Sequence, residues 1–169
     1  MAANNWIPIE SLSGASANYS FTSIPSGYKS LILKGSVQSA TNTFMQICSM
    51  RCNSDTGTNY GYGEFGYREN TTTLRTSMWD SQSGGYFAWI GGSYLGDWLS
   101  HVEMHIFGYD NTDRYTQWVG TASTGAGAQG YNSTIFMGGV WKDTSVVTQL
   151  DTVNMNPDAD SRLTLYGRK

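Results

Sequence analysis

The sequence is poor in charge, since only 14% of its 169 residues are Asp, Glu, Lys or Arg, against ~25% in an ordinary globular protein. The formal net charge is −3 at pH 7, and the lysines and arginines are scattered along the chain. A protein that binds nucleic acid through the phosphate backbone needs a concentrated basic surface. We therefore expect no nucleic-acid partner.

Long apolar runs are also missing. No stretch approaches the ~20 apolar residues of a membrane-spanning helix, and the segment from Met1 to Trp6 has neither the basic nor the apolar part of a secretory signal. We expect no membrane partner and no secretory precursor.

Cysteine is scarce, with Cys48 and Cys52 the two in the chain. On a strand, their spacing places both side chains on one face but ~13 Å apart, at ~3.3 Å of rise per residue. A disulfide needs Cα atoms within ~7 Å. We therefore expect two free thiols, as in a protein folded in a reducing cytoplasm, buried as small apolar side chains.

The sequence is rich instead in Gly, Ser, Thr and Asn, and 14% of its residues are aromatic. This composition favours strands and turns and disfavours helices. A chain of this length usually forms one domain. We predict an all-β fold over residues 1–169, an antiparallel β-sandwich of jelly-roll type with about eight to ten strands. Strand-like segments lie near both ends, so we expect the fold to bring the ends together.

Alternation of apolar and polar residues is cleanest at residues 99–109, where Val102, Met104 and Ile106 should point inward and His101, Glu103, His105 and Phe107 outward. Residues 58–85 read as a long irregular excursion with one or two short strands, and residues 121–130 as a flexible loop. Further strands are expected at residues 6–12, 18–21, 28–37, 44–53, 86–94, 115–119, 134–141, 147–155 and 162–166.

No residue pattern indicates catalysis. His101, Glu103 and His105 would share one strand face, but zinc ligands converge at ~2.0–2.1 Å and usually come from two or more segments, so we interpret the row as a polar sheet face. The sequence has no G-x-S-x-G turn and no glycine-rich loop with a phosphate-binding lysine. We expect no enzyme, no catalytic residue, no metal and no cofactor.

Aromatic residues concentrate between residues 60 and 98. They can fill a core that is poor in leucine or anchor a protein interface, and the sequence leaves these two interpretations about equal, with stacking on sugar rings as a lesser one. The interface candidates are Trp6, Tyr60, Tyr62, Phe65, Tyr67 and Trp79. The carbohydrate candidates are Tyr86, Trp89 and Trp98.

Five short segments carry a family resemblance: residues 21–31 (FTSIPSGYKSL), 53–60 (NSDTGTNY), 106–111 (IFGYDN), 139–141 (GVW) and 161–167 (SRLTLYG). In these segments and their order, the chain resembles small β-sandwich virion proteins of tailed bacteriophages, of the type found in phages of cyanobacteria and other marine bacteria. It departs from the family pattern in its two cysteines and in the Gly- and Tyr-rich insert over residues 60–86.

The resemblance implies a structural protein of the virion, assembled in the cytoplasm of the bacterial host. It favours a capsid decoration (cement) protein that binds the major capsid protein and itself, as a homotrimer. The main alternative is a tail-fibre or appendage module that recognises carbohydrate on the host surface. An enzyme such as a polysaccharide depolymerase is a third and lesser alternative.

Overall fold

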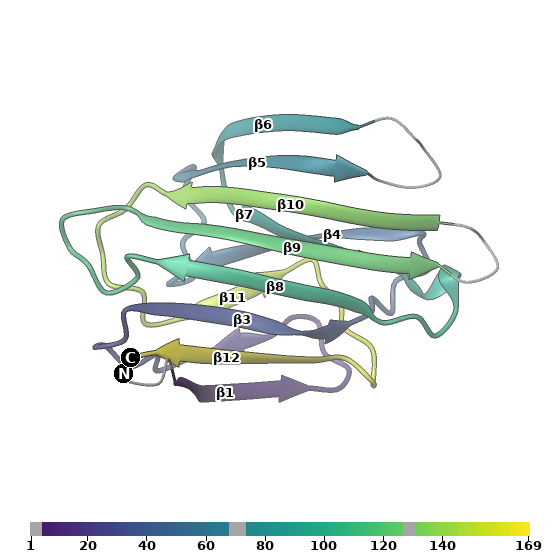
Figure 1. The fold of residues 1–169 in the computed structure, drawn as a ribbon, viewed down its shortest axis with the longest axis horizontal. Coiled ribbons are helices and arrows are strands. Elements are labelled where there is room, and N and C mark those ends of the chain that lie inside the picture. The colour runs from purple at the N-terminus through teal and green to yellow at the C-terminus, as the bar shows by residue number, and fades with distance from the viewer. Residues whose placement is uncertain (1–4, 68–73, 127–130) are drawn as a thin grey trace.

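The protein is an all-β sandwich of two antiparallel sheets, seen here in a computed structural model that describes residues 5–67, 74–126 and 131–169 (Figure 1). The large sheet has the order β1-β12-β3-β8-β9-β10-β5-β6, and the small sheet the order β2-β11-β4-β7. This confirms the predicted fold class. The strands are β1 (Trp6–Ser13), β2 (Ser20–Phe21), β3 (Ser30–Val37), β4 (Met45–Cys52), β5 (Tyr60–Tyr67), β6 (Arg75–Gln82), β7 (Gly85–Gly91), β8 (Ser100–Phe107), β9 (Thr116–Ala126), β10 (Tyr131–Trp141), β11 (Leu150–Val153) and β12 (Arg162–Arg168), with one 3₁₀ turn, η1 (Ser93–Leu95).

The jelly roll in particular stays a prediction. A jelly roll is built from eight strands arranged as two Greek keys. Among the described residues, the strands divide into eight and four instead.

The two ends of the chain lie together, as expected. β1 pairs with β12 from Trp6 opposite Arg168 to Ser13 opposite Arg162, and β12 pairs with β3 on its other side. Figure 1 shows the start of β1 and the end of β12 at the same corner of the molecule. The C-terminal strand is thereby held between two neighbours inside the large sheet.

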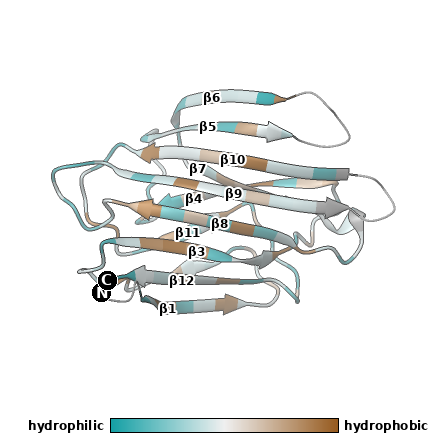
Figure 2. Ribbon diagram, viewed as in Figure 1, coloured by the Kyte–Doolittle hydropathy of each residue, from teal (hydrophilic) through white to brown (hydrophobic). Residues whose placement is uncertain are grey.

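The inner faces of the two sheets form the main core. Apolar segments recur along strands such as β3 and β10 (Figure 2), and the alternation in β8 is the expected one, with Val102, Met104 and Ile106 buried. Aromatic side chains take much of the remaining volume, because Tyr60 and Trp141 are fully enclosed with their rings stacked at 6.5 Å. Some of the aromatic residues of this chain therefore lie in the core.

Two segments expected to be irregular are more regular than the sequence suggested. Residues 58–85 hold two strands, as the upper expectation allowed, but β5 and β6 are eight residues long each, pair as a hairpin and extend the large sheet, while residues 68–73 lie outside the described residues. Residues 121–126 continue β9 and pair with β10, while residues 127–130 lie outside the described residues. Glycine lowers the strand preference of both segments, but pairing with a neighbouring strand outweighs that local preference.

Cys48 and Cys52 are both buried in the core as free thiols, which confirms the prediction. Burial raises the pKa of each thiol, because a thiolate would lose its hydration there. Burial also raises the pKa of the Tyr60 and Tyr62 hydroxyls.

We predict that the protein loses stability in alkaline solution. A group with a folded-state pKa above its unfolded value stabilises the fold fully below the unfolded pKa, and that contribution is lost as the pH rises further. For each buried thiol the loss begins near pH ~8.5 and has a limiting slope of about 1.4 kcal/mol per pH unit. Guanidinium unfolding at a series of pH values measures it, and Cys48→Ala should give a shallower slope. A free energy of unfolding that stays constant from neutral pH to about pH 10 would contradict the prediction.

Candidate functional site

Four exposed apolar side chains gather on the outer face of the large sheet. Their exposed fractions are 50% for Phe65, 90% for Met78, 51% for Val119 and 51% for Phe136. They come from four adjacent strands, β5, β6, β9 and β10, and Phe65 lies directly opposite Phe136 with ring centroids 6.3 Å apart. We call this group the outer apolar patch.

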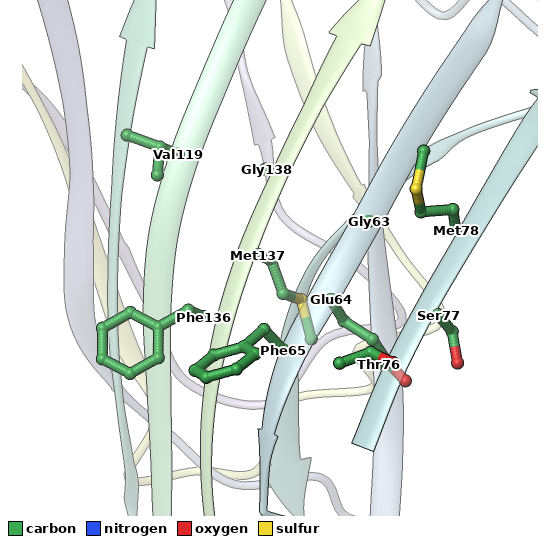
Figure 3. A pocket seen from close by; sticks show the side chains of 10 residues that line it. All are labelled: Gly63, Glu64, Phe65, Thr76, Ser77, Met78, Val119, Phe136, Met137 and Gly138. Carbon is green, nitrogen blue, oxygen red and sulfur yellow. The ribbon is translucent and has the colours of Figure 1, made fainter. Parts of the chain in front are cut away.

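A groove of about 560 Å³ lies within the outer apolar patch (Figure 3). Gly63 and Gly138 are paired across β5 and β10, so its floor carries no side chains. The rings of Phe65 and Phe136 lie on one side of this floor and Met78 on the other. The groove is therefore open, mostly apolar and wide enough to accept a side chain from another molecule.

Packing does not require the glycines of the groove floor. A Cβ atom at Gly138 would find its nearest neighbour, the Trp118 carbonyl oxygen, at 3.4 Å, and at Gly63 the Ser77 carbonyl oxygen at 3.4 Å, which are ordinary contacts. At Gly139, by contrast, a Cβ would overlap the Trp118 ring. Packing of the core therefore requires glycine at Gly139. At Gly63 and Gly138 a larger side chain would fit, so packing does not explain why the floor of the groove lacks side chains.

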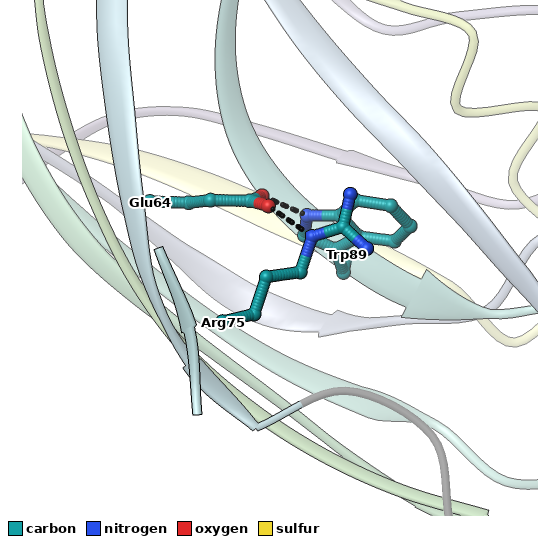
Figure 4. Close-up of polar contacts among 3 residues, drawn as sticks. All are labelled: Glu64, Arg75 and Trp89. Atoms are coloured by element: carbon teal, nitrogen blue, oxygen red, sulfur yellow. Dashed lines mark hydrogen bonds and ion pairs between the residues drawn. The ribbon is translucent and has the colours of Figure 1, made fainter. Parts of the chain in front are cut away.

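A buried carboxylate lies behind the groove and holds its strands together (Figure 4). Glu64 of β5 accepts one hydrogen bond from the Trp89 indole on β7 and one from Arg75 Nε on β6, each at 2.9 Å. The Glu64 side chain is almost fully enclosed, and that of Arg75 is 41% exposed. These contacts attach the β5–β6 hairpin to the small sheet.

The other half of the outer face is polar. His101, Glu103, His105 and Phe107 point outward from β8 as expected, with His105 Nε2 3.1 Å from Glu103 Oε1. A second groove of about 470 Å³ is lined by His101 and Glu103 of this row together with Lys34, Arg162, Thr164 and Tyr166. In the described parts of the chain, no cluster of three or more His, Cys, Asp or Glu side chains is arranged to hold a metal.

The six interface candidates separate into exposed and buried groups. Phe65 and Tyr67 are exposed on β5, and Trp6 lies half-buried with its ring 5.9 Å from that of His105. Tyr60 and Tyr62 are core residues, and Trp79 packs on Tyr62 at 5.1 Å. This corrects the expectation for Tyr60 and Tyr62, which strand alternation turns inward, on the face of β5 opposite to Gly61 and Gly63.

The carbohydrate candidates do not share one open surface. Tyr86 is half-buried with its ring stacked on Tyr62 at 4.2 Å, and Trp89 is buried with its indole on Glu64. Trp98 is half exposed just after η1. The sequence interpretation missed two exposed rings near that turn, Phe44 and Tyr94, whose centroids lie 4.4 Å apart.

Comparison with known proteins adds nothing to this geometry, since no family model, no curated protein and no solved structure matches the chain. Within the described residues, no helix has the length and apolar character needed to cross a bilayer.

We predict that Glu64→Ala destabilises the protein by roughly 1–3 kcal/mol, because it leaves the buried Trp89 indole without this acceptor and Arg75 without its carboxylate. Guanidinium unfolding measures the loss. The matched control is Glu103→Ala on the outer face, which should stay within about 0.5 kcal/mol of the wild type. Equal effects of the two substitutions would show that Glu64 does not hold the hairpin.

We also predict that valine substitutions at two adjacent glycines have different effects on the melting temperature. Gly138→Val should leave the melting temperature within a few degrees of the wild type, because a side chain fits there in the groove. Gly139→Val should unfold the protein or lower the melting temperature strongly, because the new side chain overlaps the Trp118 ring. Calorimetry or circular dichroism on heating compares them, and similar melting temperatures would contradict the packing described for Trp118.

Proposed function

We propose that the protein is a structural component of a tailed-phage virion, and specifically a capsid decoration protein that binds the major capsid protein through the outer face of its large sheet. The observation that carries the proposal is the outer apolar patch, since an exposed apolar cluster rimmed by polar residues is typical of a protein-binding surface. The resemblance of five segments to phage virion proteins supplies the class of partner.

The surface chemistry supports attachment to a repeating lattice. Few charges and many Ser, Thr and Asn side chains suit direct and water-mediated hydrogen bonds around an apolar centre. A homotrimer, with each subunit in the proposed jelly roll, would bind three lattice sites at once and convert weak contacts into avid attachment. Sedimentation that shows a monomer at micromolar concentration would contradict the trimer.

A second candidate function is a tail-fibre or appendage module that recognises host carbohydrate. Phe44, Tyr94 and Trp98 favour it, because all three rings are exposed near η1 and aromatic faces stack on sugar rings. Gln38 supports the local backbone there by donating hydrogen bonds from its side-chain amide to the carbonyls of Gly92 and Gly96. Binding of the isolated protein to a glycan array, lost in Trp98→Ala, would favour this function.

We predict that the double variant Phe65→Ala and Phe136→Ala weakens binding to phage heads that lack the protein. Loss of two exposed rings from the outer apolar patch should cost at least tenfold in affinity. Pelleting and imaging of mixed heads measure the binding, together with the rise in melting temperature of the decorated heads. Phe107→Ala, on the same face but outside the groove, is the matched control. Wild-type protein that fails to bind heads but binds host cells would overturn the decoration function.

A further inference from the structure

The polar half of the outer face carries an excess of positive charge. Strand alternation turns Arg162 and Arg168 of β12 and Lys34 of β3 outward. Glu103 of β8 is the one carboxylate at the outward positions of β12, β3 and β8, all of which the structure describes. The chain as a whole has a formal net charge of −3. This part of the surface is therefore positive in a protein that is negative overall.

Two of these cations line the second groove of about 470 Å³, which we call the basic groove. Ser36 of β3 lies directly opposite Arg162 on β12 and directly opposite His101 on β8. Lys34 lies two residues before Ser36 on the same face, so Lys34 and Arg162 are diagonal neighbours, typically ~7–8 Å apart at their Cα atoms. The basic groove therefore combines two permanent cations with a hydroxyl and an imidazole that can donate hydrogen bonds.

Neither Lys34 nor Arg162 forms an ion pair with a carboxylate in the part of the chain that the structure describes. Lys34 Nζ lies 5.3 Å from the centroid of the Tyr166 ring, and Arg162 Nε donates to the Ser11 hydroxyl at 3.0 Å. Both partners are neutral, and a guanidinium has further N–H groups that can donate to a ligand. Two like charges on neighbouring strands repel each other. An anion bound between them would remove this repulsion.

Glu103 lines the basic groove but does not supply that anion. Its Oε1 atom lies 3.1 Å from His105 Nε2. His105 and His101 lie on opposite sides of Glu103 along β8, and Ser36 is opposite His101. The Glu103 carboxylate therefore leans away from Ser36. The cations of the basic groove remain available to a carboxylate from another molecule.

The basic groove and the outer apolar patch are neighbours on one surface. Lys34 is opposite Glu103, Glu103 is opposite Thr121 on β9, and Thr121 is opposite Phe136 on β10. These four residues form one row across adjacent strands. Three strand spacings place Lys34 and Phe136 ~14 Å apart at their Cα atoms. One partner surface of ordinary size, ~800 Å², can therefore cover the groove and the patch together.

We propose that the basic groove binds the carboxylate of an Asp or Glu side chain on the protein that covers the outer apolar patch. Arg162 can hold a carboxylate with two parallel hydrogen bonds, and Lys34 adds a second positive charge. The inference rests on the proposed function, because it takes this acidic side chain from the major capsid protein. Charge pairs beside an apolar centre set the orientation and the rate of association more than the affinity.

An acidic polysaccharide fits the basic groove less well. Of the Phe, Tyr and Trp side chains, Tyr166 alone lines the groove, and the Lys34 ammonium lies over its ring. This ring face is therefore not available for stacking on a sugar. A protein surface, in contrast, can present a carboxylate to the groove and apolar side chains to the outer apolar patch at the same time.

The first test needs no capsid. Blocked hexaglutamate is titrated into the full chain at low ionic strength, with blocked hexaglutamine as the neutral control, and NMR follows the amides of the basic groove. We expect these amides to shift with hexaglutamate alone. The double variant Lys34→Gln and Arg162→Gln should weaken binding by about tenfold or more. The matched control, Lys29→Gln with Arg114→Gln, changes the net charge equally at exposed residues outside the groove and should bind as the wild type does.

The second test uses immobilised phage heads that lack the protein and measures the rate of association at a series of salt concentrations. Salt screens exposed charges, so wild-type association should slow by roughly tenfold between ~50 mM and ~500 mM salt. The double variant Lys34→Gln and Arg162→Gln should associate more slowly at low salt and depend less on salt. Both side chains are exposed, so its melting temperature should stay within a few degrees of the wild type, which confirms that the variant is folded.

The two tests distinguish this proposal from the proposed function. Equal rates and equal salt dependence for the wild type and the double variant on heads overturn the basic groove and leave the decoration function standing. Wild-type protein that fails to bind heads overturns the decoration function, and hexaglutamate binding that needs Lys34 and Arg162 then keeps the groove as a site for an acidic protein segment. No shift of the groove amides with hexaglutamate overturns the carboxylate as the ligand. Tighter binding of an oligouronate of equal charge would make a glycan the occupant and overturn the protein partner.

Discussion

One buried carboxylate connects the two sheets behind the outer apolar patch. Glu64 accepts hydrogen bonds from the Trp89 indole and from Arg75, and so connects β5, β6 and β7. Burial of a carboxylate is unfavourable unless its oxygens are satisfied, and here each oxygen has a partner. Because the β5–β6 hairpin extends the large sheet past the rest of the sandwich (Figure 1), this attachment keeps Phe65 and Met78 in position beside Phe136. Together with the pairing of β5 to β10, these contacts hold the strands that line the groove.

The large sheet has one apolar and one polar half, and each suits a different contact. The outer apolar patch has a bare floor at Gly63 and Gly138, where side chains would fit but are missing. The polar half carries His101 and Glu103, which line one groove with Lys34 and Arg162. A partner that covered both halves would meet an apolar anchor next to a polar rim, the usual arrangement of a protein interface. This division supports an attachment role.

Several features could be predicted from residue patterns because they depend on neighbours in sequence. The alternation at residues 100–107 assigned inward and outward side chains correctly, and the spacing of Cys48 and Cys52 indicated free thiols. Other features could not. The residues of β5 alternate as well, but alternation between aromatic residues and glycine does not indicate which face points into the core, so the sequence leaves Tyr60 and Tyr62 among the interface candidates. Val119 and Phe136 lie on segments predicted as strands, and period-two alternation could have identified their outward direction.

By itself, the sequence determined the all-β class, the meeting of the two chain ends and the burial of the thiols, because strand alternation and composition act locally or through the need of a terminal strand to pair. Only the tertiary structure decided where the candidate site lies. Gly63 and Gly138 form one floor because β5 pairs with β10, and β6 is an edge strand because it comes last in the order of the described sheet. Strand order is set by the packing of the whole sandwich, so residues far apart in the sequence become neighbours without any local signal.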